Sequence, residues 1–204
     1  MLLNRMSSCQ YITYSLHNLK QHMKMFKSIF ALIALVAVSQ FTFAQKAPMV
    51  GGAAMYPNKT IVENASQANN LTTLVAAVKA ADLVETLSGP GPFTVFAPTN
   101  DAFDKLPKGT VETLLKPENK AMLADVLTYH VVSGKVMAAD LMKMIKENRG
   151  KAMVKTVAGV TLLATIKGKN VVLIDEKGNS STVTTADINQ SNGVVHVIDS
   201  VLLH

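Results

Sequence analysis

Cysteine and tryptophan are almost absent from this sequence, which has one cysteine, Cys9, and no tryptophan among its 204 residues. A single cysteine excludes a disulfide within the chain. The residues after Cys9 have no thiolate for nucleophilic catalysis or zinc binding. The sequence also lacks a Gly-x-Ser-x-Gly nucleophile elbow, a His-x-x-x-His pair and an aspartate-rich loop. We therefore predict no catalytic residue, no metal site and no cofactor.

Acidic residues are missing from the first 44 positions. All fourteen follow residue 44, together with sixteen of the twenty basic residues, so the net charge of +6 falls to +2 without that segment. Basic stripes with interleaved aromatic residues are missing too, which excludes a nucleic-acid partner. One basic cluster is interpreted mainly as the solvated face of a helix, with an anionic-ligand patch as the alternative. It comprises Lys143, Lys146, Arg149, Lys151 and Lys155.

Charge is also missing between Ser28 and Phe43, an almost wholly apolar run. Two lysines precede the run and Ala44 follows it, which indicates a secretory signal peptide over 23–44 with cleavage after Ala44. A membrane anchor is the alternative, but the run is shorter than the roughly 20 residues that a spanning helix needs. The protein is therefore expected to be exported to the periplasm, the cell surface or the medium. No membrane span is expected after signal removal.

The segments on either side of this signal are not expected to belong to a folded domain. Residues 1–22 show no clear pattern, and Met23 or Met25 is a more typical start for a signal peptide. We interpret 1–22 as a doubtful leader that is absent from the mature protein. Residues 45–57 hold two prolines and two glycines with little apolar period, so they are predicted to be a flexible link.

The stretch from Phe93 to Phe103 is predicted to be the structural centre of a domain. Its first half has the alternation of a half-buried strand, which Pro98 ends because proline has no N–H to donate. Asn100 and Asp101 are helix N-cap types and are expected to cap a short helix. The stretch also contains every phenylalanine after residue 43, so it should mark a core centre. The apolar run at 193–203 is the natural partner strand.

The remaining pattern places helices first and strands later. Helical spacing predicts helices at 60–68, 71–80, 82–88, 111–115, 119–129 and 138–147. Alternation and β-branched residues predict strands at 93–98, 129–132, 151–157, 160–166, 170–174, 182–185 and 194–203. This segregation predicts an α+β fold with an antiparallel or mixed sheet, in one domain over 58–204.

Three motifs in chain order resemble those of the fasciclin domain family. Thr94–Phe103 resembles its first signature box, Tyr129-His130 its tyrosine–histidine pair, and Asn192–Leu202 its second box. His204 stands where many members have proline. The resemblance implies a β-wedge or sandwich with a helical lobe mostly from the N-terminal half. The residues that match the motifs structurally are Thr94, Phe96, Pro98, Asn100, Asp101, Phe103, Gly193 and His196.

The same resemblance implies a secreted or surface-displayed module associated with adhesion and matrix binding, and small single-domain members are typical of bacteria. Animal members associated with integrin binding use two places, which fall on Tyr129-His130 and Asp187-Ile188 here. The residues around the second pair differ from those of such motifs. The alternative for that pair is structural: Asp187 caps the turn into the last strand and Ile188 packs inward.

The histidines and Asp101 are interpreted as structural. Asp101 fits a first-turn acid that stabilises a helix start by roughly 1 kcal/mol. His130 follows an apolar helix face, which favours a buried side chain bonded to the backbone. His196 alternates with Val195 and Val197, so it faces the other side of its strand.

We therefore predict an exported, non-enzymatic binding or adhesion module whose partner is an extracellular or cell-surface protein or glycan. One alternative is a carrier with a small-ligand pocket between helical lobe and sheet. Another is an exported hydrolase or metal enzyme that uses His130 and His196. The oligomeric state cannot be derived from the sequence.

Overall fold

A seven-stranded mixed sheet forms the framework of residues 47–203, the part of the chain that the computed structural model describes. Its strand order is β4-β3-β9-β8-β7-β6-β5. β3 and β9 run parallel, and every other neighbouring pair is antiparallel. The strands are β3 (Phe93–Pro98), β4 (Val131–Ser133), β5 (Lys151–Lys155), β6 (Thr161–Lys167), β7 (Asn170–Ile174), β8 (Ser180–Gln190) and β9 (Gly193–Ile198). The predicted α+β class with a mixed sheet is confirmed.

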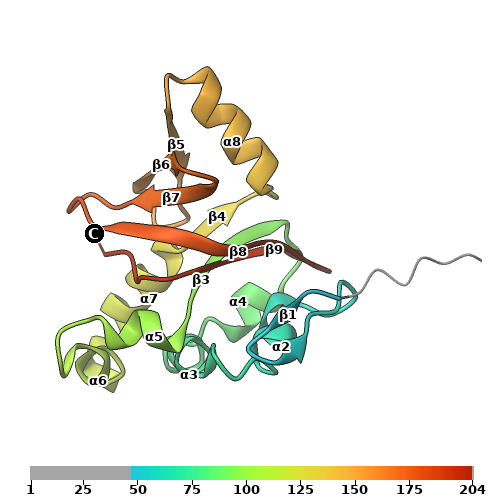
Figure 1. Ribbon diagram of the computed structural model, residues 1–204. Helices are drawn as coiled ribbons and strands as arrows, with labels where there is room; N and C mark the ends of the chain where they lie inside the picture. The colour runs from blue at the N-terminus through green and yellow to red at the C-terminus, as the bar shows by residue number, and fades with distance from the viewer. Residues whose placement is uncertain (1–46, 204) are drawn as a thin grey trace, which may run out of the picture. The chain divides into compact units, whose positions relative to one another are not determined.

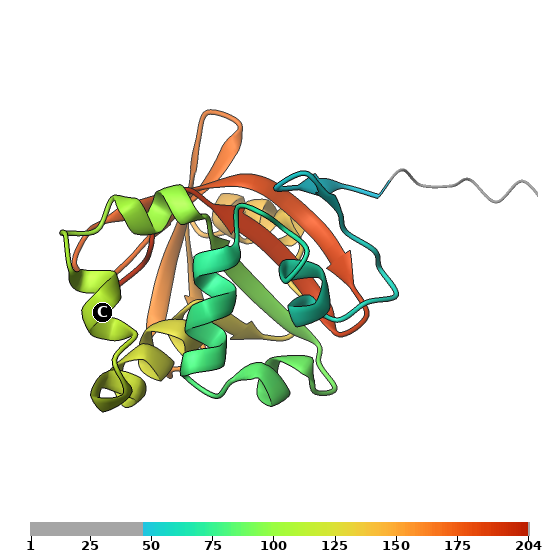
Figure 2. The same ribbon diagram turned by 90° about the horizontal axis from the view of Figure 1, so that it is seen from below.

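Helices gather on one side of this sheet, and α8 lies apart from them on the other side beside β5, β6 and β7 (Figures 1 and 2). The group on the first side, called the helical lobe below, comes mostly from the N-terminal half, as predicted. It contains α2 (Ile61–Ala65), α3 (Thr72–Ala80), α4 (Val84–Ser88), α5 (Asn100–Asp104), α6 (Thr110–Leu114), η2 (Pro117–Asn119) and α7 (Lys120–Tyr129). α8 spans Ala138–Glu147.

Two separate apolar cores lie on the two faces of the sheet. The helix-side core includes Val95 and Val197 with the buried faces of α3 and α7. The α8-side core includes Phe96 and Ile198 with α8 and the strands β5–β7. Neighbouring residues of β3 and β9 thus enter different cores, because successive side chains of a strand point to opposite faces.

The three phenylalanines of the central stretch do not mark one core centre, so that prediction is wrong. Phe93 and Phe103 pack in the helix-side core, whereas Phe96 is fully buried in the α8-side core. Phe93 and Phe96 differ by an odd number of positions on β3, which places them on opposite faces.

Element bounds differ from the prediction mainly at chain turns. α2 ends at Ala65, and the Ser66 hydroxyl then donates to the Glu63 carbonyl at 2.7 Å. β9 ends at Ile198, and the carboxylate of the next residue, Asp199, accepts a hydrogen bond from the Thr182 N–H at 2.7 Å. β8 is much longer than predicted, since its second half pairs with β9 through two register shifts.

The predicted flexible link at 45–57 is wrong for the residues that the structure describes. Residues 49–54 form a small ribbon of β1 (Met49–Val50) and β2 (Ala53–Ala54). Val50 and Met55 are 5% and 2% exposed and belong to the helix-side core. Their apolar positions are too few to show a period in the sequence, although they bury well. The predicted leader at 1–22 and signal peptide at 23–44 lie outside the described residues.

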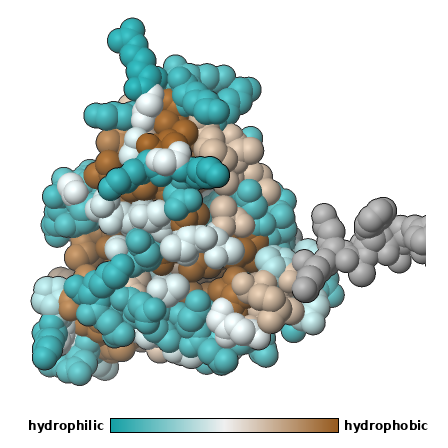
Figure 3. All heavy atoms as spheres, in the orientation of Figure 1, coloured by the Kyte–Doolittle hydropathy of each residue, from teal (hydrophilic) through white to brown (hydrophobic). Residues whose placement is uncertain are grey.

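The face of residues 47–203 that Figure 3 shows mixes hydrophilic and hydrophobic residues. The large exposed apolar side chains of residues 47–203 are Met49, Tyr56, Met122, Met144, Met153 and Val157, of which Met153 is the most exposed at 76%. Within these residues no helix is both long and apolar enough to cross a membrane.

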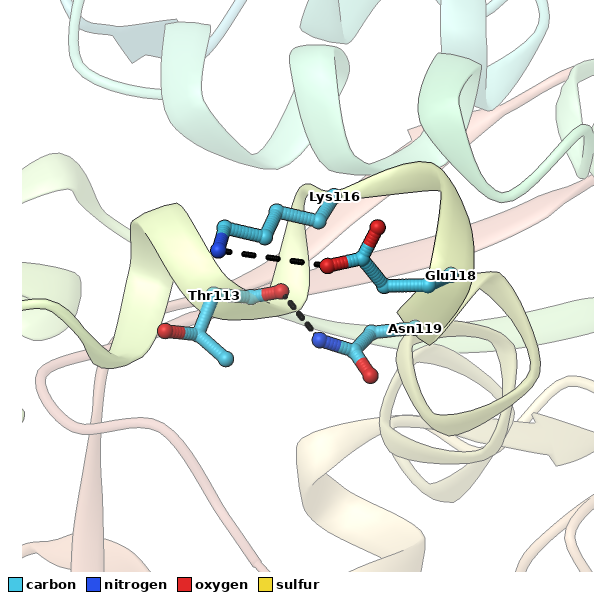
Figure 4. Close-up of polar contacts among 4 residues, drawn as sticks. All are labelled: Thr113, Lys116, Glu118 and Asn119. Atoms are coloured by element: carbon cyan, nitrogen blue, oxygen red, sulfur yellow. Dashed lines mark hydrogen bonds and ion pairs between the residues drawn. The ribbon is translucent and has the colours of Figure 1, made fainter.

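The corner between α6 and α7 shows how proline and polar side chains end helices in the helical lobe. α6 ends at Leu114, close to the predicted end of the helix at 111–115, and Pro117 begins the short η2 turn. The Asn119 amide donates to the Thr113 carbonyl at 2.7 Å (Figure 4). Lys116 and Glu118 lie 3.9 Å apart across the same turn (Figure 4), an exposed ion pair that contributes little stability.

Candidate functional site

Three motif side chains hold the loop that leads into α8, and we call Thr94, Asp187 and His196 the loop anchor. The Thr94 hydroxyl donates to the Gly134 carbonyl at 2.7 Å and accepts the Val136 N–H at 2.9 Å. These two bonds provide partners for backbone groups of Gly134 and Val136, which lie beyond the end of β4 and pair with no strand. The loop anchor therefore fixes the path from β4 to α8.

His196 connects this loop to β8. Its Nε2 lies 2.9 Å from the Val136 carbonyl and its Nδ1 accepts the Asp187 N–H at 3.2 Å. The ring is therefore neutral with its proton on Nε2, and it stacks on Phe96 with centroids 5.6 Å apart. Burial lowers the pKa of His196. Two smaller effects raise it: the hydrogen bond with the Val136 carbonyl and the negative charge of Asp187. These contacts fit the structural role that we predict for His196.

Asp187 completes the loop anchor. Its carboxylate accepts the N–H of Ala138, the first residue of α8, at 2.7 Å. It has a positive φ of 61°, at the second of the two register shifts of β8. Aspartate tolerates this left-handed conformation better than most residues. Asp187 thus caps α8 and does not cap the turn into β9, the structural role that the sequence suggested as its alternative.

His130 has an equally structural environment on the other side of the sheet. Its Nδ1 lies 2.7 Å from the Val126 carbonyl, and its Nε2 accepts the Leu202 N–H at 3.1 Å. Only 3% of the residue is exposed. The imidazole therefore joins the end of α7 to the C-terminal segment, as predicted for a buried histidine bonded to the backbone.

Tyr129 is fully buried in the α8-side core and meets the His130 ring edge to face, with centroids 6.4 Å apart. Burial raises the pKa of its phenol, and the Asp175 and Glu176 carboxylates raise it further, while a hydrogen bond with the Glu176 backbone lowers it. The raised pKa keeps the phenol protonated at neutral pH.

The four residues proposed from the resemblance as adhesion contacts do not form a surface. Tyr129, His130 and Ile188 are 0%, 3% and 1% exposed, and Asp187 is only half-buried but is engaged with α8. Tyr129 lies in the α8-side core and Ile188 in the helix-side core. A partner that docks on the folded domain cannot contact the side chains of Tyr129, His130 and Ile188, and Ile188 packs inward, as its structural alternative suggested.

Asn100 does not cap its own helix, which corrects a second expectation. Thr99 caps α5 by accepting the Ala102 N–H at 3.3 Å. The Asn100 amide oxygen instead accepts the Thr73 N–H at 3.0 Å in the first turn of α3, whose own N-cap residue, Leu71, provides no side-chain bond. Asp101 is a first-turn acid of α5, as predicted.

Asn192 is a structural residue whose role the sequence did not indicate. Its amide oxygen accepts the N–H of Ile61, the first residue of α2, at 3.0 Å. Its amide nitrogen donates to the carbonyls of Leu87 and Gly89 at the end of α4, at 2.8 and 3.1 Å. Its position before Gly193 signals a turn, but partners more than 100 positions away leave no local signal.

Gly193 is required by a close approach of two strands. A Cβ at this position would lie 2.0 Å from the Phe93 carbonyl oxygen on β3. Real Cβ atoms do not come so near, so only glycine permits the parallel pairing of β3 with β9 at this end. The match of Gly193 to the second motif thus has a physical cause.

The space between the helical lobe and the sheet is too small for the ligand that the carrier alternative places there. The apolar cavity in this position is lined by residues including Leu74, Val95 and His130, and its volume of about 30 Å³ has room for no more than a few water molecules. No three His, Cys, Asp or Glu residues within 47–203 are grouped to hold a metal ion. Both histidines proposed for catalysis use their ring nitrogens in backbone hydrogen bonds.

The fold is a mixed sheet with a helical lobe, and side chains of the sequence motifs bond its elements together. These features are those of a fasciclin-type domain. The sequence pattern of the Fasciclin domain matches residues 69–204, and the chain belongs to this family. It is 50% identical over 168 residues to Protein sll1483 of Synechocystis sp., covering 82% of this chain and 86% of that protein.

More distant similarity extends to longer proteins. The pig Transforming growth factor-beta-induced protein ig-h3 is 36% identical over 146 residues, or 72% of this chain but 19% of that protein. Immunogenic protein MPB70 of Mycobacterium bovis is 35% identical over 144 residues, covering 68% of this chain and 66% of that protein. The FAS1 domain pair of the insect cell adhesion molecule Fasciclin I superposes with a TM-score of 0.66 at 19% identity. That match covers 72% of this chain and 52% of the pair, and it shows the shared fold.

Proposed function

We propose that this protein is an exported, non-enzymatic binding module that acts in adhesion through surface contacts with matrix or cell-surface components. Export rests on the apolar run and its flanks at 23–44, which have the pattern of a signal peptide. Adhesion rests on the family and on the likeness in fold to a domain pair from a cell adhesion molecule. The partner is an extracellular or cell-surface protein or glycan.

The proposal that the module is not an enzyme is based on its motif residues, whose side chains are used to hold the fold together. Thr94, His130, Asp187 and His196 each bond backbone groups that hold separate elements together. A general acid or base must instead reach a substrate within hydrogen-bond distance. Since these side chains are engaged internally, the module acts through its outer surface.

Location and binding can be tested together in the cells that make the protein. The full chain would carry an affinity tag after His204, and cells would be separated into cytoplasm, periplasm, membranes and medium. We expect the mature form to begin at Gln45 outside the cytoplasm and to retain a surface protein or glycan after crosslinking. A tagged variant with the apolar run at 28–43 interrupted by two arginines should stay inside. Cytoplasmic wild type, or exported protein without any bound surface component, would contradict the proposal.

A further inference from the structure

β5 is an edge strand of the sheet, and every second side chain along it is exposed. β5 is the last strand in the sheet order, and within residues 47–203 no strand pairs with its outer side. Just beyond its end, the Val157 N–H donates to the Val131 carbonyl at 2.7 Å, which closes that side. The open length is therefore Lys151–Lys155. Figure 3 shows hydrophilic atoms at the top of the view, where α8 leads into this strand.

The pairing of β5 with β6 determines which backbone groups face outward. The Thr156 N–H donates to the Val160 carbonyl at 2.9 Å, so Thr156 opposes Val160 as a bonded pair. Bonded and non-bonded pairs alternate in an antiparallel ladder. Met153 and Lys155 oppose Leu163 and Thr161 as non-bonded pairs. Their N–H and C=O groups therefore point away from β6, toward the open edge.

Side chains on the same edge add charge and apolar area. Lys151, Met153 and Lys155 are exposed on one face of β5, while Ala152 and Val154 are buried on the other. Neither lysine takes part in the ion pairs found within residues 47–203. Their Cα atoms lie roughly 13 Å apart along an extended strand, with Met153 midway. The edge thus presents a basic, an apolar and a basic side chain in a line.

The charge around β5 contrasts with the rest of the domain. Residues 135–169 contain eight basic and two acidic residues, a net charge of +6. The other residues between 47 and 203 contain seven basic and twelve acidic residues, a net charge of −5. A field of this kind attracts a negatively charged partner to the β5 end.

We propose that β5 is a docking edge for an extended acidic segment of a partner protein, which adds to the sheet as a further strand. This inference rests on the proposed binding function and identifies one surface and partner class for it. Water can bond the outward backbone groups of Met153 and Lys155 in the free domain, and an added strand replaces that water with its own N–H and C=O groups. Acidic side chains two positions on either side of an apolar one match Lys151, Met153 and Lys155.

Two other occupants fit less well. A second copy of this chain would bring lysines opposite lysines, and such like-charge pairs destabilise a sheet. An anionic membrane would attract the lysines, but burial of the strand in lipid would leave its free backbone groups without partners. An acidic strand pairs with the lysine charges of β5 and also bonds its outward N–H and C=O groups.

The test uses the proposed mature protein, which begins at Gln45 and includes every core residue named above. The ligand is a fluorescent peptide with the core Glu-Thr-Val-Thr-Glu, compared with Lys-Thr-Val-Thr-Lys. Met153→Pro removes the outward N–H at an edge position that tolerates proline. Met153→Thr is its matched control. Lys151→Glu/Lys155→Glu reverses the edge charge, and Lys79→Glu/Lys108→Glu makes the same change of net charge on the helical lobe.

We expect anisotropy to show binding of the acidic peptide to wild type, weakened about tenfold by Met153→Pro, the equivalent of one lost hydrogen bond, and little by Met153→Thr. The Lys151→Glu/Lys155→Glu variant should prefer the basic peptide, and the helical-lobe variant should behave as wild type. Amide NMR shifts should change at Lys151–Lys155 in the bound wild type.

Several results would overturn the docking edge. They are absence of peptide binding, equal effects of Met153→Pro and Met153→Thr, or equal weakening by both double charge variants. Binding to anionic phosphatidylglycerol vesicles in place of the peptide would assign β5 to a membrane surface. If cells still capture the surface component with the Met153→Pro protein, the binding function stands and only its assignment to β5 fails.

Discussion

The Asn100 side chain stabilises the start of a helix other than its own. Its amide oxygen accepts the Thr73 N–H, and its amide nitrogen donates to the Asn69 carbonyl at 3.1 Å. Asn100→Ala should lower the free energy of unfolding by about 1–2 kcal/mol, the usual loss for a helix cap. Urea denaturation would measure this. Asp101→Ala is the control, expected to cost less than about 1 kcal/mol because Asp101 contributes only to the helix dipole. Equal losses would contradict the remote cap.

A substitution at Gly193 tests whether a close contact between strands costs more stability than a strained backbone conformation does. Gly193→Ala forces a methyl group into the Phe93 carbonyl and should cost about 3 kcal/mol or more, the upper range for an overpacked site. Gly159→Ala has open space but a positive φ of 84°, and should cost only about 1–2 kcal/mol. The midpoints of thermal unfolding would rank the two variants. A milder effect at Gly193 would show that β3 and β9 can separate without loss of stability.

The buried His196 should make the stability of the domain depend on pH. Its folded-state pKa is lowered, so the unfolded chain binds more protons. The stabilisation is fully present above the unfolded pKa of about 6.5 and is lost as the pH falls toward the folded pKa. Stability should rise with pH in this range, with a slope that one titrating group limits to about 1.4 kcal/mol per pH unit. Urea denaturation from pH 8 to 5 would measure it, and His196→Gln should show a shallower slope. An unchanged slope in that variant would assign the dependence to other groups.

α8 depends on contacts from outside its own sequence. Asp187 accepts the Ala138 N–H, and the Asp140 carboxylate accepts the Met137 N–H at 3.1 Å. Asp187→Ala should cost about 2 kcal/mol through the lost cap and the strained left-handed conformation. Asp187→Asn keeps an acceptor and tolerates positive φ, so it should cost under about 1 kcal/mol. Hydrogen exchange of the α8 amides would locate the effect. Equal exchange in both variants would mean that the carboxylate does not hold this helix.

Elements with a strong local pattern could be predicted from the sequence, and those that depend on distant partners could not. The alternation in β3 and the apolar face of α7 gave nearly correct bounds. β8 was predicted at less than half its length, because its pairing with β9 continues through bulges that break the alternation. The identity of the motif residues was predictable, but Asn100 and Asn192 bond backbone groups that only the fold brings near.

The fold also changes what the binding motifs mean. Sequence resemblance placed the contacts at Tyr129-His130 and Asp187-Ile188, since motif position is all that a single sequence provides. Burial then excludes Tyr129, His130 and Ile188 from the surface of the folded domain. The exposure of Met153 could not be predicted, because a strand's buried face is determined by what packs against it. For β5 that element is α8.

The two cores should unfold as one, although they lie on opposite faces of the sheet. β3 places Val95 in the helix-side core and Phe96 in the α8-side core, and β9 does the same with Val197 and Ile198. Loss of either core removes the support of strands that the other core needs. The domain therefore has no boundary along which one half could unfold alone, and two-state unfolding is expected.

Single substitutions in each core can test this cooperativity in protein that begins at Gln45. Leu74→Ala in the helix-side core and Leu162→Ala in the α8-side core should each cost about 2–5 kcal/mol. Since the chain has no tryptophan, Tyr56→Phe leaves Tyr129 as the only fluorescent reporter of this protein, buried in the α8-side core. In that background, Leu74→Ala should shift the tyrosine transition and the far-ultraviolet circular dichroism transition by the same amount. If the tyrosine transition stayed at its original denaturant concentration while the helical signal moved, the α8-side core would be an independent folding unit.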